Sequence, residues 1–385
     1  MSSTKSLPAR PSLEYLKKLA KEQLASLRRR DPDALLADAQ LAVARVYGFA
    51  SWRKLKASVD ESRKALHVTA PTEDQVRDFI QALERGDHAI IRRSLREAPA
   101  LANAKLPDPS SHGKSMLHFA AERNDTRSVG LLLDAGASPE ALMAAHTPLS
   151  WAVTVGAIDA AKVLAARGPK PDLFSAAGLG DRKLVASFFD EHGHLRSGAS
   201  RTGSSRFGPD KTRLPCPPEK ESEIVADALY VACRLGHASV AKFLLDHKPD
   251  LSFQAYVGGT PLHWAYFGGN QQIIKMLLAA GASPSRTDNP YRCTARGFGI
   301  HVPSDWGFLR MVRERLKDDP SLAKLFDGGT TPLHRAAHGG HAAVVKFLIE
   351  AGADPKARNA EGKTAAEVAR EQKHEDVALA IEQVM

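Results

Sequence analysis

The chain has 385 residues, of which 43% are hydrophobic, so it can bury a substantial core. Its formal net charge of +9 favours acidic partners in general without naming one. The three cysteines are an odd number without CxxC spacing, which argues against a disulfide scaffold and a thiolate zinc site. Because the sequence has neither a signal-peptide core nor a long apolar run, we expect a cytoplasmic protein.

Residues 1–66 differ from the rest in charge and pattern. An amphipathic helix is predicted by apolar residues at helical spacing, namely Leu13, Leu16, Ala20, Leu24 and Leu27. Two further helices are expected before residue 66. Fourteen Lys and Arg stand against seven Asp and Glu in this basic helical segment. A solvated helical face explains such a charge run, and the alternative is a surface for nucleic acid, an anionic membrane or an acidic protein.

From about residue 73 the chain repeats itself. Matching segments begin at Ser115, Thr147, Thr260 and Thr331, and the last two open with TPLH. Ser115 and Thr147 are 32 residues apart, and a threonine follows Thr331 at a distance of 33. Several TPLH-like motifs at a period of about 33 residues resemble the ankyrin repeat. The resemblance implies an all-α fold, an ankyrin-repeat solenoid of stacked helix-turn-helix units with hairpin loops.

The resemblance extends over residues 73–385, with local departures. We expect an opening cap at 73–103, a long flexible insertion at about 194–221, a degenerate repeat at about 288–325 and a closing cap at 360–385. The insertion is rich in Gly, Ser, Pro and Arg and has no apolar period. The degenerate repeat lacks TPLH and contains Pro303, so its first helix is expected to be broken. Leu262 and Leu333, the TPLH leucines, are expected to be fully buried.

The basic segment also carries a resemblance of its own. Its string YGFASWRKLKA is similar to the helical segment that precedes ankyrin repeats in many bacterial proteins. That similarity implies a bacterial type of ankyrin-repeat protein and no particular activity.

Side chains capable of chemistry are scattered along the sequence. The family resemblance assigns His118, His263 and His334 a structural hydrogen bond to the turn backbone. Outside the repeat framework the reactive types are His192, His194, His301, Asp305 and Cys216. The sequence has no GxSxG, HExxH or P-loop motif. We therefore predict no enzyme, no cofactor and no metal site, and keep an enzyme site near the degenerate repeat and the insertion as an alternative.

The resemblance also implies where a partner binds. In this family the hairpin tips and first helices form a concave face, contacted just before TPLH and just after the paired alanines. Those positions predict a protein–protein interaction scaffold with these contact residues: Lys114, Glu122, Arg123, Thr154, Val155, Arg234, Tyr256, Val257, Phe267 and His338. Arg, Tyr and Phe are typical interface anchors. The alternative is binding of nucleic acid or an anionic surface through residues 1–66 and the insertion.

Overall fold

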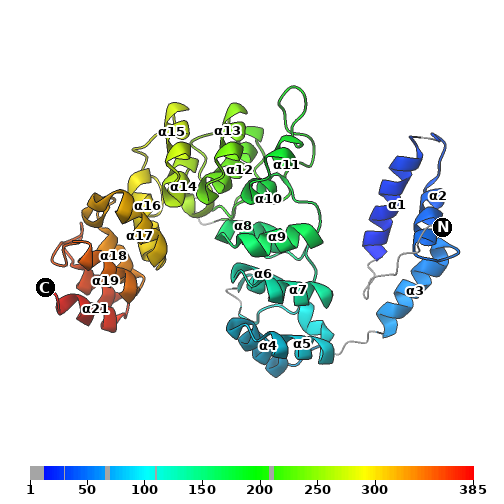
Figure 1. The fold of residues 1–385 in the computed structure, drawn as a ribbon, viewed down its shortest axis with the longest axis horizontal. Helices are drawn as coiled ribbons and strands as arrows, with labels where there is room; N and C mark the ends of the chain where they lie inside the picture. The colour runs from blue at the N-terminus through cyan, green and yellow to red at the C-terminus, as the bar shows by residue number, and fades with distance from the viewer. Residues whose placement is uncertain (1–12, 30, 66–69, 109–110, 208–211) are drawn as a thin grey trace. The chain divides into compact units, whose positions relative to one another are not determined.

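The computed structural model describes residues 13–29, 31–65, 70–108, 111–207 and 212–385 (Figure 1). They form two compact units, one made of the chain up to Phe119 with 127–138, the other of 120–126 with 139–385. Across these ranges the regular structure is helical, with isolated β-bridges and no longer strand. The predicted all-α fold is confirmed. The helices in these ranges are too short or too polar to span a bilayer.

The first unit opens with a small group of three helices. They are α1 (Leu13–Leu27), α2 (Leu36–Val46) and α3 (Trp52–Ala65). Their shared core consists of Leu16, Ala20, Val43, Ala44, Leu55 and Val59. The apolar stripe that predicted the first helix therefore faces this core. The predicted boundary after residue 66 falls next to residues 66–69, outside the described part of the chain, and stays a prediction.

The remainder of the first unit begins with a capped helix pair. Thr72 accepts the N–H of Gln75 at 3.2 Å and so caps the start of α4 (Glu73–Arg85). The helix ends at Gly86, whose φ of 65° is in the left-handed region that glycine favours. Then follow α5 (His88–Glu97) and the 3₁₀ helix η1 (Pro99–Asn103). The division between the two units crosses the next pair, α6 (Met116–Glu122) and α7 (Thr126–Asp134).

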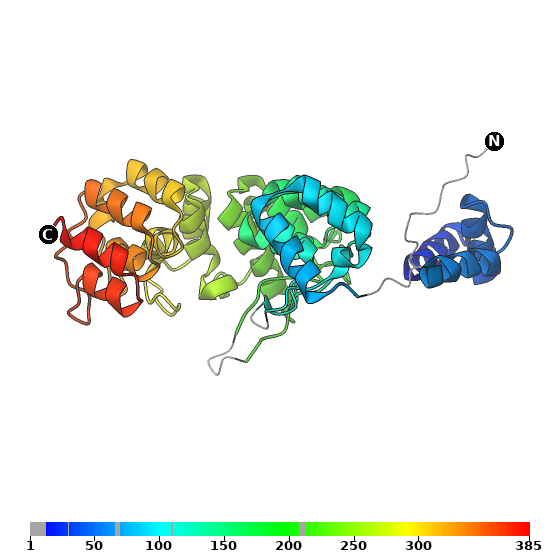
Figure 2. The ribbon, with the colours of Figure 1, turned by 90° about the horizontal axis from the view of Figure 1, so that it is seen from below.

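The second unit is a stack of helix pairs in chain order (Figures 1 and 2). The first helices of the pairs are α8 (Pro148–Val155), α10 (Leu173–Leu179), α12 (Glu221–Leu235), α14 (Pro261–Gly268), α16 (Ala295–Asp305), α18 (Pro332–His338) and α20 (Ala365–Glu371). The second helices are α9 (Ile158–Arg167), α11 (Arg182–Ala186), α13 (Ala238–Asp246), α15 (Gln271–Ala279), α17 (Leu309–Asp318), α19 (Ala342–Glu350) and α21 (Glu375–Glu382). Two 3₁₀ turns, η3 (Tyr256–Gly258) and η4 (Pro320–Lys324), lie in the connections. Each first helix packs on the first helix of the next pair.

The TPLH motif fastens the start of a first helix to the loop that follows its pair. In α14 the Nδ1 atom of His263 lies 2.7 Å from Oγ1 of Thr260, and its Nε2 lies 3.2 Å from the backbone oxygen of Arg286. His334 makes the corresponding contact to the backbone oxygen of Lys363 at 2.9 Å. Burial lowers the pKa of both histidines, which favours the neutral ring that this pairing needs. The predicted structural role of these two histidines is confirmed.

A second type of hydrogen bond joins neighbouring pairs at the other end of the first helices. The residue after the helix-ending glycine reaches back to the preceding first helix. Nε2 of His237 lies 3.0 Å from the backbone oxygen of Gly178. The amide of Asn270 donates to the backbone oxygen of Gly236 at 3.2 Å. Carbonyl groups that the end of a helix leaves unpaired are thus satisfied by the next repeat.

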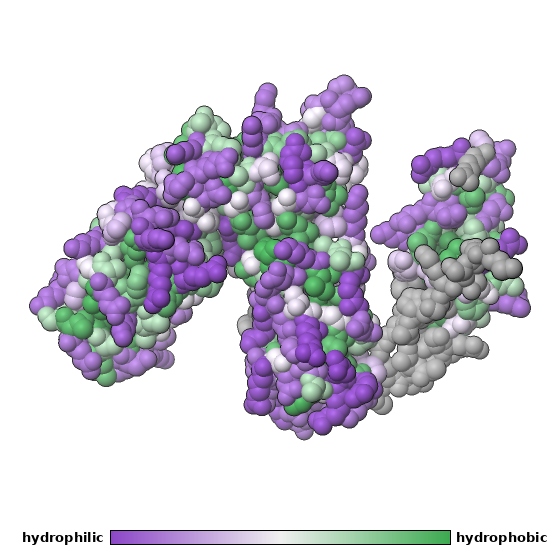
Figure 3. All heavy atoms as spheres, in the orientation of Figure 1, coloured by the Kyte–Doolittle hydropathy of each residue, from purple (hydrophilic) through white to green (hydrophobic). Residues whose placement is uncertain are grey.

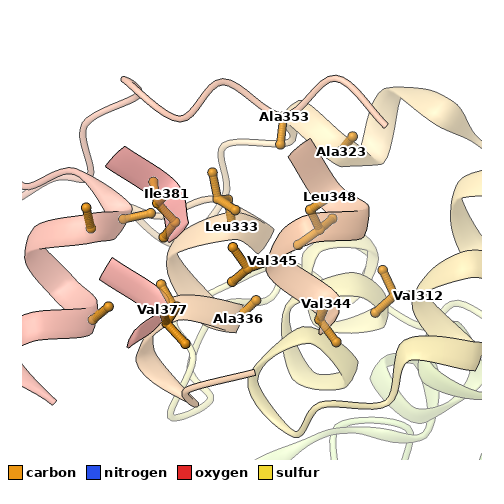
Figure 4. Packing of buried hydrophobic residues seen from close by; sticks show 14 of the residues in the cluster. Val312, Ala323, Leu333, Ala336, Val344, Val345, Leu348, Ala353, Val377 and Ile381 are labelled. Carbon is orange, nitrogen blue, oxygen red and sulfur yellow. The ribbon is translucent and has the colours of Figure 1, made fainter. Parts of the chain in front are cut away.

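The apolar faces of the pairs meet in a continuous core. Leu333 is 1% exposed and lies among Val345, Leu348 and Ile381 (Figure 4). Leu262 is equally buried, so the prediction for both TPLH leucines is confirmed. The cluster around Leu333 draws its residues from more than one helix pair, which is why a single repeat cannot form this core alone.

The degenerate repeat does not have the broken helix that its proline suggested, so that expectation was wrong. Helix α16 runs without interruption to Asp305 and includes Pro303. Because Pro303 stands in the last turn of the helix, its missing N–H costs one hydrogen bond there, and the preceding turns form without it. The N–H of Trp306 still donates to the backbone oxygen of Val302 at 3.0 Å. The fully buried ring of Phe298 anchors this helix in the stack.

Truncating a TPLH leucine should destabilise the second unit. Leu333→Ala removes a fully buried side chain and leaves a cavity, so we expect a loss of about 2–5 kcal/mol in the free energy of unfolding. Leu379→Ala, at a leucine that is 49% exposed, is the matched control and should lose far less. Urea unfolding followed by circular dichroism measures both. Similar losses in the two variants would contradict the assigned role of Leu333.

His301 on α16 is an uncompensated polar group in the interior of the stack. Its side chain is fully buried, and neither ring nitrogen has a hydrogen-bond partner among the described residues. Burial, with a smaller contribution from Arg335, lowers the pKa of His301 to about 4, against an opposing effect of Asp327. The folded protein therefore holds this ring neutral far below the pH at which an unfolded chain protonates it.

Acidification should destabilise the protein through His301. The unfolded histidine takes up a proton below about pH 6.5 and the folded one near pH 4, so its contribution to stability is present above pH 6.5 and is lost as the pH falls to 4. The loss is at most about 3 kcal/mol. His301→Phe should lack this component in urea titrations across that range. His192→Phe, at a ring that is 75% exposed, should keep it. Identical pH profiles for His301→Phe and the wild type would refute the assignment.

Candidate partner-binding surface

Six of the ten predicted contact residues belong to the second unit and are at least partly exposed to solvent. Arg123 and His338 are exposed, and Glu122, Val155, Tyr256 and Val257 are half-buried. Lys114 belongs to the first unit and is half-buried there. The visible face of the second unit is largely hydrophilic, with smaller hydrophobic patches among the hydrophilic residues (Figure 3).

Two of the half-buried or exposed side chains are held in place by neighbours. The indole N–H of Trp151 donates to Glu122 at 2.9 Å. Nδ1 of His338 lies 2.8 Å from a carboxylate oxygen of Asp305, and the other oxygen of Asp305 accepts from the hydroxyl of Tyr291 at 3.1 Å. These side chains are therefore held in a set orientation.

Val257 stands in a backbone conformation that valine rarely adopts. Its φ is 54° in the η3 turn just before α14, in the left-handed region. A β-branched residue there is strained, and such strain is often found at functional sites. Tyr256 precedes it and is half-buried.

Thr154 and Phe267 do not present a surface to a partner. Thr154 is fully buried, and its hydroxyl donates to the backbone oxygen of Ser150 at 2.8 Å. Phe267 is 3% exposed because rings of the next helix pair enclose it, with Trp306 at 5.7 Å and Phe308 at 6.4 Å between centroids. The sequence positions are those of the family's contact residues, but here they are used for packing between repeats.

Arg234 is also deeply buried, yet it is charged. It stands in the last turn of α12 and is 8% exposed. Its guanidinium lies over the rings of Trp264 and Phe267, at 5.2 and 5.4 Å from their centroids. The atoms Nε and Nη1 have no hydrogen-bond partner among the described residues. Burial lowers the pKa of Arg234, although arginine stays charged at neutral pH.

Tyr230, one turn before Arg234, is a residue that the sequence analysis missed. It is fully buried, and its ring centroid lies 5.4 Å from that of Trp264. Burial raises the pKa of Tyr230. Tyr230 stands 33 residues before His263, at the place of the TPLH histidine. The sequence signal that could have identified Tyr230 is therefore a tyrosine at the position where the TPLH motif has histidine.

The insertion between α11 and α12 is anchored to the stack over part of its length (Figure 2). Asp172 accepts the backbone N–H groups of Arg201 at 2.9 Å and Thr202 at 2.7 Å. Asp227 accepts the N–H of Ser204 at 2.9 Å, and burial raises the pKa of Asp227 to about 6. Thr202 and Ser204 are buried, so the expected flexibility does not apply to this stretch. Residues 208–211 lie outside the described residues.

The reactive residue types outside the framework contact different neighbours. Asp190 accepts the backbone N–H groups of His192 and His194, both at 2.9 Å, which makes the HxH sequence a turn. Cys216 lies beside Asp227, and burial raises the pKa of its thiol to about 12, which keeps it protonated at neutral pH. Nowhere in the described ranges do three His, Cys, Asp or Glu side chains group as they would around a metal ion.

The basic helices expose their cations to solvent. The exposed Lys and Arg of α1 to α3 include Lys17, Lys18, Lys21, Arg45, Arg53, Lys54 and Lys56. A solvated face and a surface for nucleic acid both require this exposure. The alternative of nucleic-acid binding therefore stays a prediction.

Family models agree with this architecture. A model of three ankyrin repeats matches residues 79–175 and 214–288, and a model of many ankyrin repeats matches residues 319–369. Together these segments make up more than half of the chain. The chain is an ankyrin-repeat protein. The matches begin after the basic segment, so the bacterial type inferred from that segment stays a prediction.

Ankyrin-repeat relatives among characterised proteins have diverse names. A probable E3 ubiquitin-protein ligase, XBOS32, from Oryza sativa subsp. japonica is 28% identical over 32% of this chain and 30% of its own length. The ankyrin repeat and KH domain-containing protein mask-1 from Caenorhabditis elegans is 30% identical over 33% of this chain and 5% of its own. The mitochondrial disaggregase from Bos taurus is 32% identical over 37% of this chain and 21% of its own. The chain thus spans less than a third of the length of these relatives.

Removing the Asp172 carboxylate should release the insertion. Asp172→Ala loses the N-cap of α10 and the bonds to residues 201 and 202, so we expect a loss of about 1–3 kcal/mol in the free energy of unfolding. Trypsin should cleave faster after Arg201. Asp181→Ala is the control, because Asp181 caps α11 through the N–H of Leu184. Unchanged cleavage in Asp172→Ala would show that other contacts hold the insertion.

Proposed function

We propose that this ankyrin-repeat protein is a scaffold that binds another protein through the first-helix ends and hairpin turns of its second unit. Ankyrin repeats are generally protein-interaction modules, and their domains are typically non-enzymatic. The observation that carries the proposal is a set of partly exposed side chains at these places, two of which, Glu122 and His338, are held by hydrogen bonds. It consists of Glu122, Arg123, Val155, Tyr256, Val257 and His338, which we call the contact set.

The contact set has the mixed chemistry of interface anchors. Tyr256 combines an apolar ring with a hydroxyl, and burial already raises its pKa, so the phenol stays neutral when a partner covers it. Arg123 and His338 supply donors at the edges. Val257 adds an apolar side chain. Its backbone has a positive φ, which is strained for valine.

A capture experiment with matched variants tests the proposal. In the first variant Arg123→Ala, Tyr256→Ala and His338→Ala truncate three members of the contact set. In the control, Lys162→Ala, Lys242→Ala and Lys346→Ala truncate three exposed lysines on second helices α9, α13 and α19. Immobilised wild type, variant and control are incubated with extract of the source cell, and bound proteins are quantified by mass spectrometry.

We expect at least one protein that the wild type and the control retain equally and that the contact-set variant retains about tenfold less. Circular dichroism and melting temperature must show all three proteins folded. A bound protein that survives the contact-set variant would move the interface elsewhere. The absence of any protein retained by the wild type over an unrelated repeat protein would remove the proposed function.

A further inference from the structure

Arg234 places unpaired hydrogen-bond donors on helix α12, beside Tyr230. The two residues are four apart, so their side chains lie next to each other along the helix. The guanidinium atoms Nε and Nη1 are buried without a hydrogen-bond partner among the residues described, whereas the Tyr230 hydroxyl interacts with Thr154. A buried charge without a partner strongly destabilises a fold. Most other buried polar groups of the stack are hydrogen-bonded, so the unpaired charge of Arg234 is an exception that lowers the stability of the fold.

Helix α14 holds the guanidinium in this position. A Cβ on Gly268 would lie 2.6 Å from the backbone oxygen of Arg234, so only glycine allows the two helices to approach this closely. The approach brings the rings of Trp264 and Phe267 over the guanidinium. The Trp264 indole N–H donates to the backbone oxygen of Tyr256 at 3.2 Å. The aromatic walls thus stabilise the charge through cation–π contacts, but they offer it no hydrogen-bond acceptor.

No carboxylate of the described residues is among the groups that act on the charge of Arg234. The groups that act on the charge of Arg234 are the phenols of Tyr230 and Tyr256, which are neutral at pH 7. Asp227 influences Tyr230 and is not among the groups that act on Arg234; its Oδ2 accepts from Ser204, and its Oδ1 has no hydrogen-bond partner among the described residues. Glu122 influences Tyr256, but its Oε2 accepts from Trp151. Within the described part of the chain, Arg234 has no ion-pair partner in its own protein.

We propose that the guanidinium of Arg234 is the centre of a subsite for the carboxylate of a glutamate or aspartate side chain on the bound protein. This inference rests on the proposed function, because it names the chemistry of the partner at one point of the same surface. A carboxylate has only acceptors, and its planar shape matches the fork of a guanidinium. The half-buried Tyr256 and Val257 lie at the adjoining turn, where the backbone around the acidic residue would rest. The net charge of +9 favours the approach of an acidic segment.

A subsite of this kind predicts opposite effects on stability and on binding. If Arg234 only held the fold together, replacing it would lower the melting temperature. If Arg234 instead serves a ligand, replacing it should not lower stability, because Arg234→Met removes the unpaired charge and keeps an apolar side chain. The variant should therefore melt at or above the temperature of the wild type while it loses the acidic ligand.

Peptide libraries provide the probe. Three libraries of 12-residue peptides share random flanks and carry at the centre glutamate, glutamine or phosphoserine. Each is passed over the immobilised full-length protein at about physiological ionic strength, where surface attraction is screened. The proteins compared are the wild type, Arg234→Met, Arg234→Lys and Arg310→Met. Arg310 is the matched control, because its side chain is 89% exposed and its removal takes away the same charge.

The wild type should retain the glutamate library at least about tenfold better than the glutamine library, and Arg234→Met should lose that preference. Arg234→Lys should keep only part of it, because lysine lacks the planar fork. Arg310→Met should stay within about twofold of the wild type. No preference for glutamate in the wild type, or equal losses in Arg234→Met and Arg310→Met, would overturn the subsite.

Two further results would also overturn it. Stronger retention of the phosphoserine library would assign the site to phosphate, and a lower melting temperature of Arg234→Met would make Arg234 structural. The protein captured in the experiment on the contact set separates the two proposals. If Arg234→Met retains that protein fully while the contact-set variant releases it, the proposed function stands and the carboxylate subsite does not.

Discussion

Every helix pair of this protein has an apolar face that only a neighbouring pair can bury, and the rest of the second unit depends on this constraint. The TPLH leucines, buried between pairs, satisfy it directly. The hydrogen bonds of His263 and His237 then set how far one pair can turn against the next. Once the register of the stack is set, first-helix ends and hairpin turns recur at regular places. A binding surface is therefore a by-product of the packing and is varied by changing residues that the core does not need.

The repeat pattern was enough to predict the fold, because TPLH specifies a local structure as well as a sequence. It also predicted the burial of Leu262 and Leu333 and the role of His263. The pattern could not show that Phe267 is buried, because its burial depends on Trp306 and Phe308, which belong to the next repeat and are not part of the motif. Pro303 led to the wrong prediction of a broken helix, because helix propensity treats any internal proline as a helix breaker. The energetic cost of a proline depends on its distance from the helix end.

Polar groups in the interior divide into those that hold the stack and those that do not. Asp172 accepts several N–H groups and is fully used by the fold. Arg234 and His301 are also buried, but within the described ranges Nε and Nη1 of Arg234 and both ring nitrogens of His301 lack such partners. A sequence alone cannot separate these cases, because the same residue types serve both. The two cases are distinguished by comparing the donors with the acceptors around each group. At Arg234 donors lack acceptors, which favours a partner from outside the chain.

The anchoring of the insertion has a consequence for how this protein can change. Asp172 and Asp227 stand at the starts of the repeat motifs on either side of the insertion and hold its residues 201–204. Helix α12 begins at Glu221 and resumes the stack. Length added to the insertion beyond its anchored residues should therefore leave the repeats in register, since the entropy of closing a loop grows only slowly with its length. The insertion is therefore a site at which evolution or protein engineering could add a new activity in the middle of the array without disrupting the repeats.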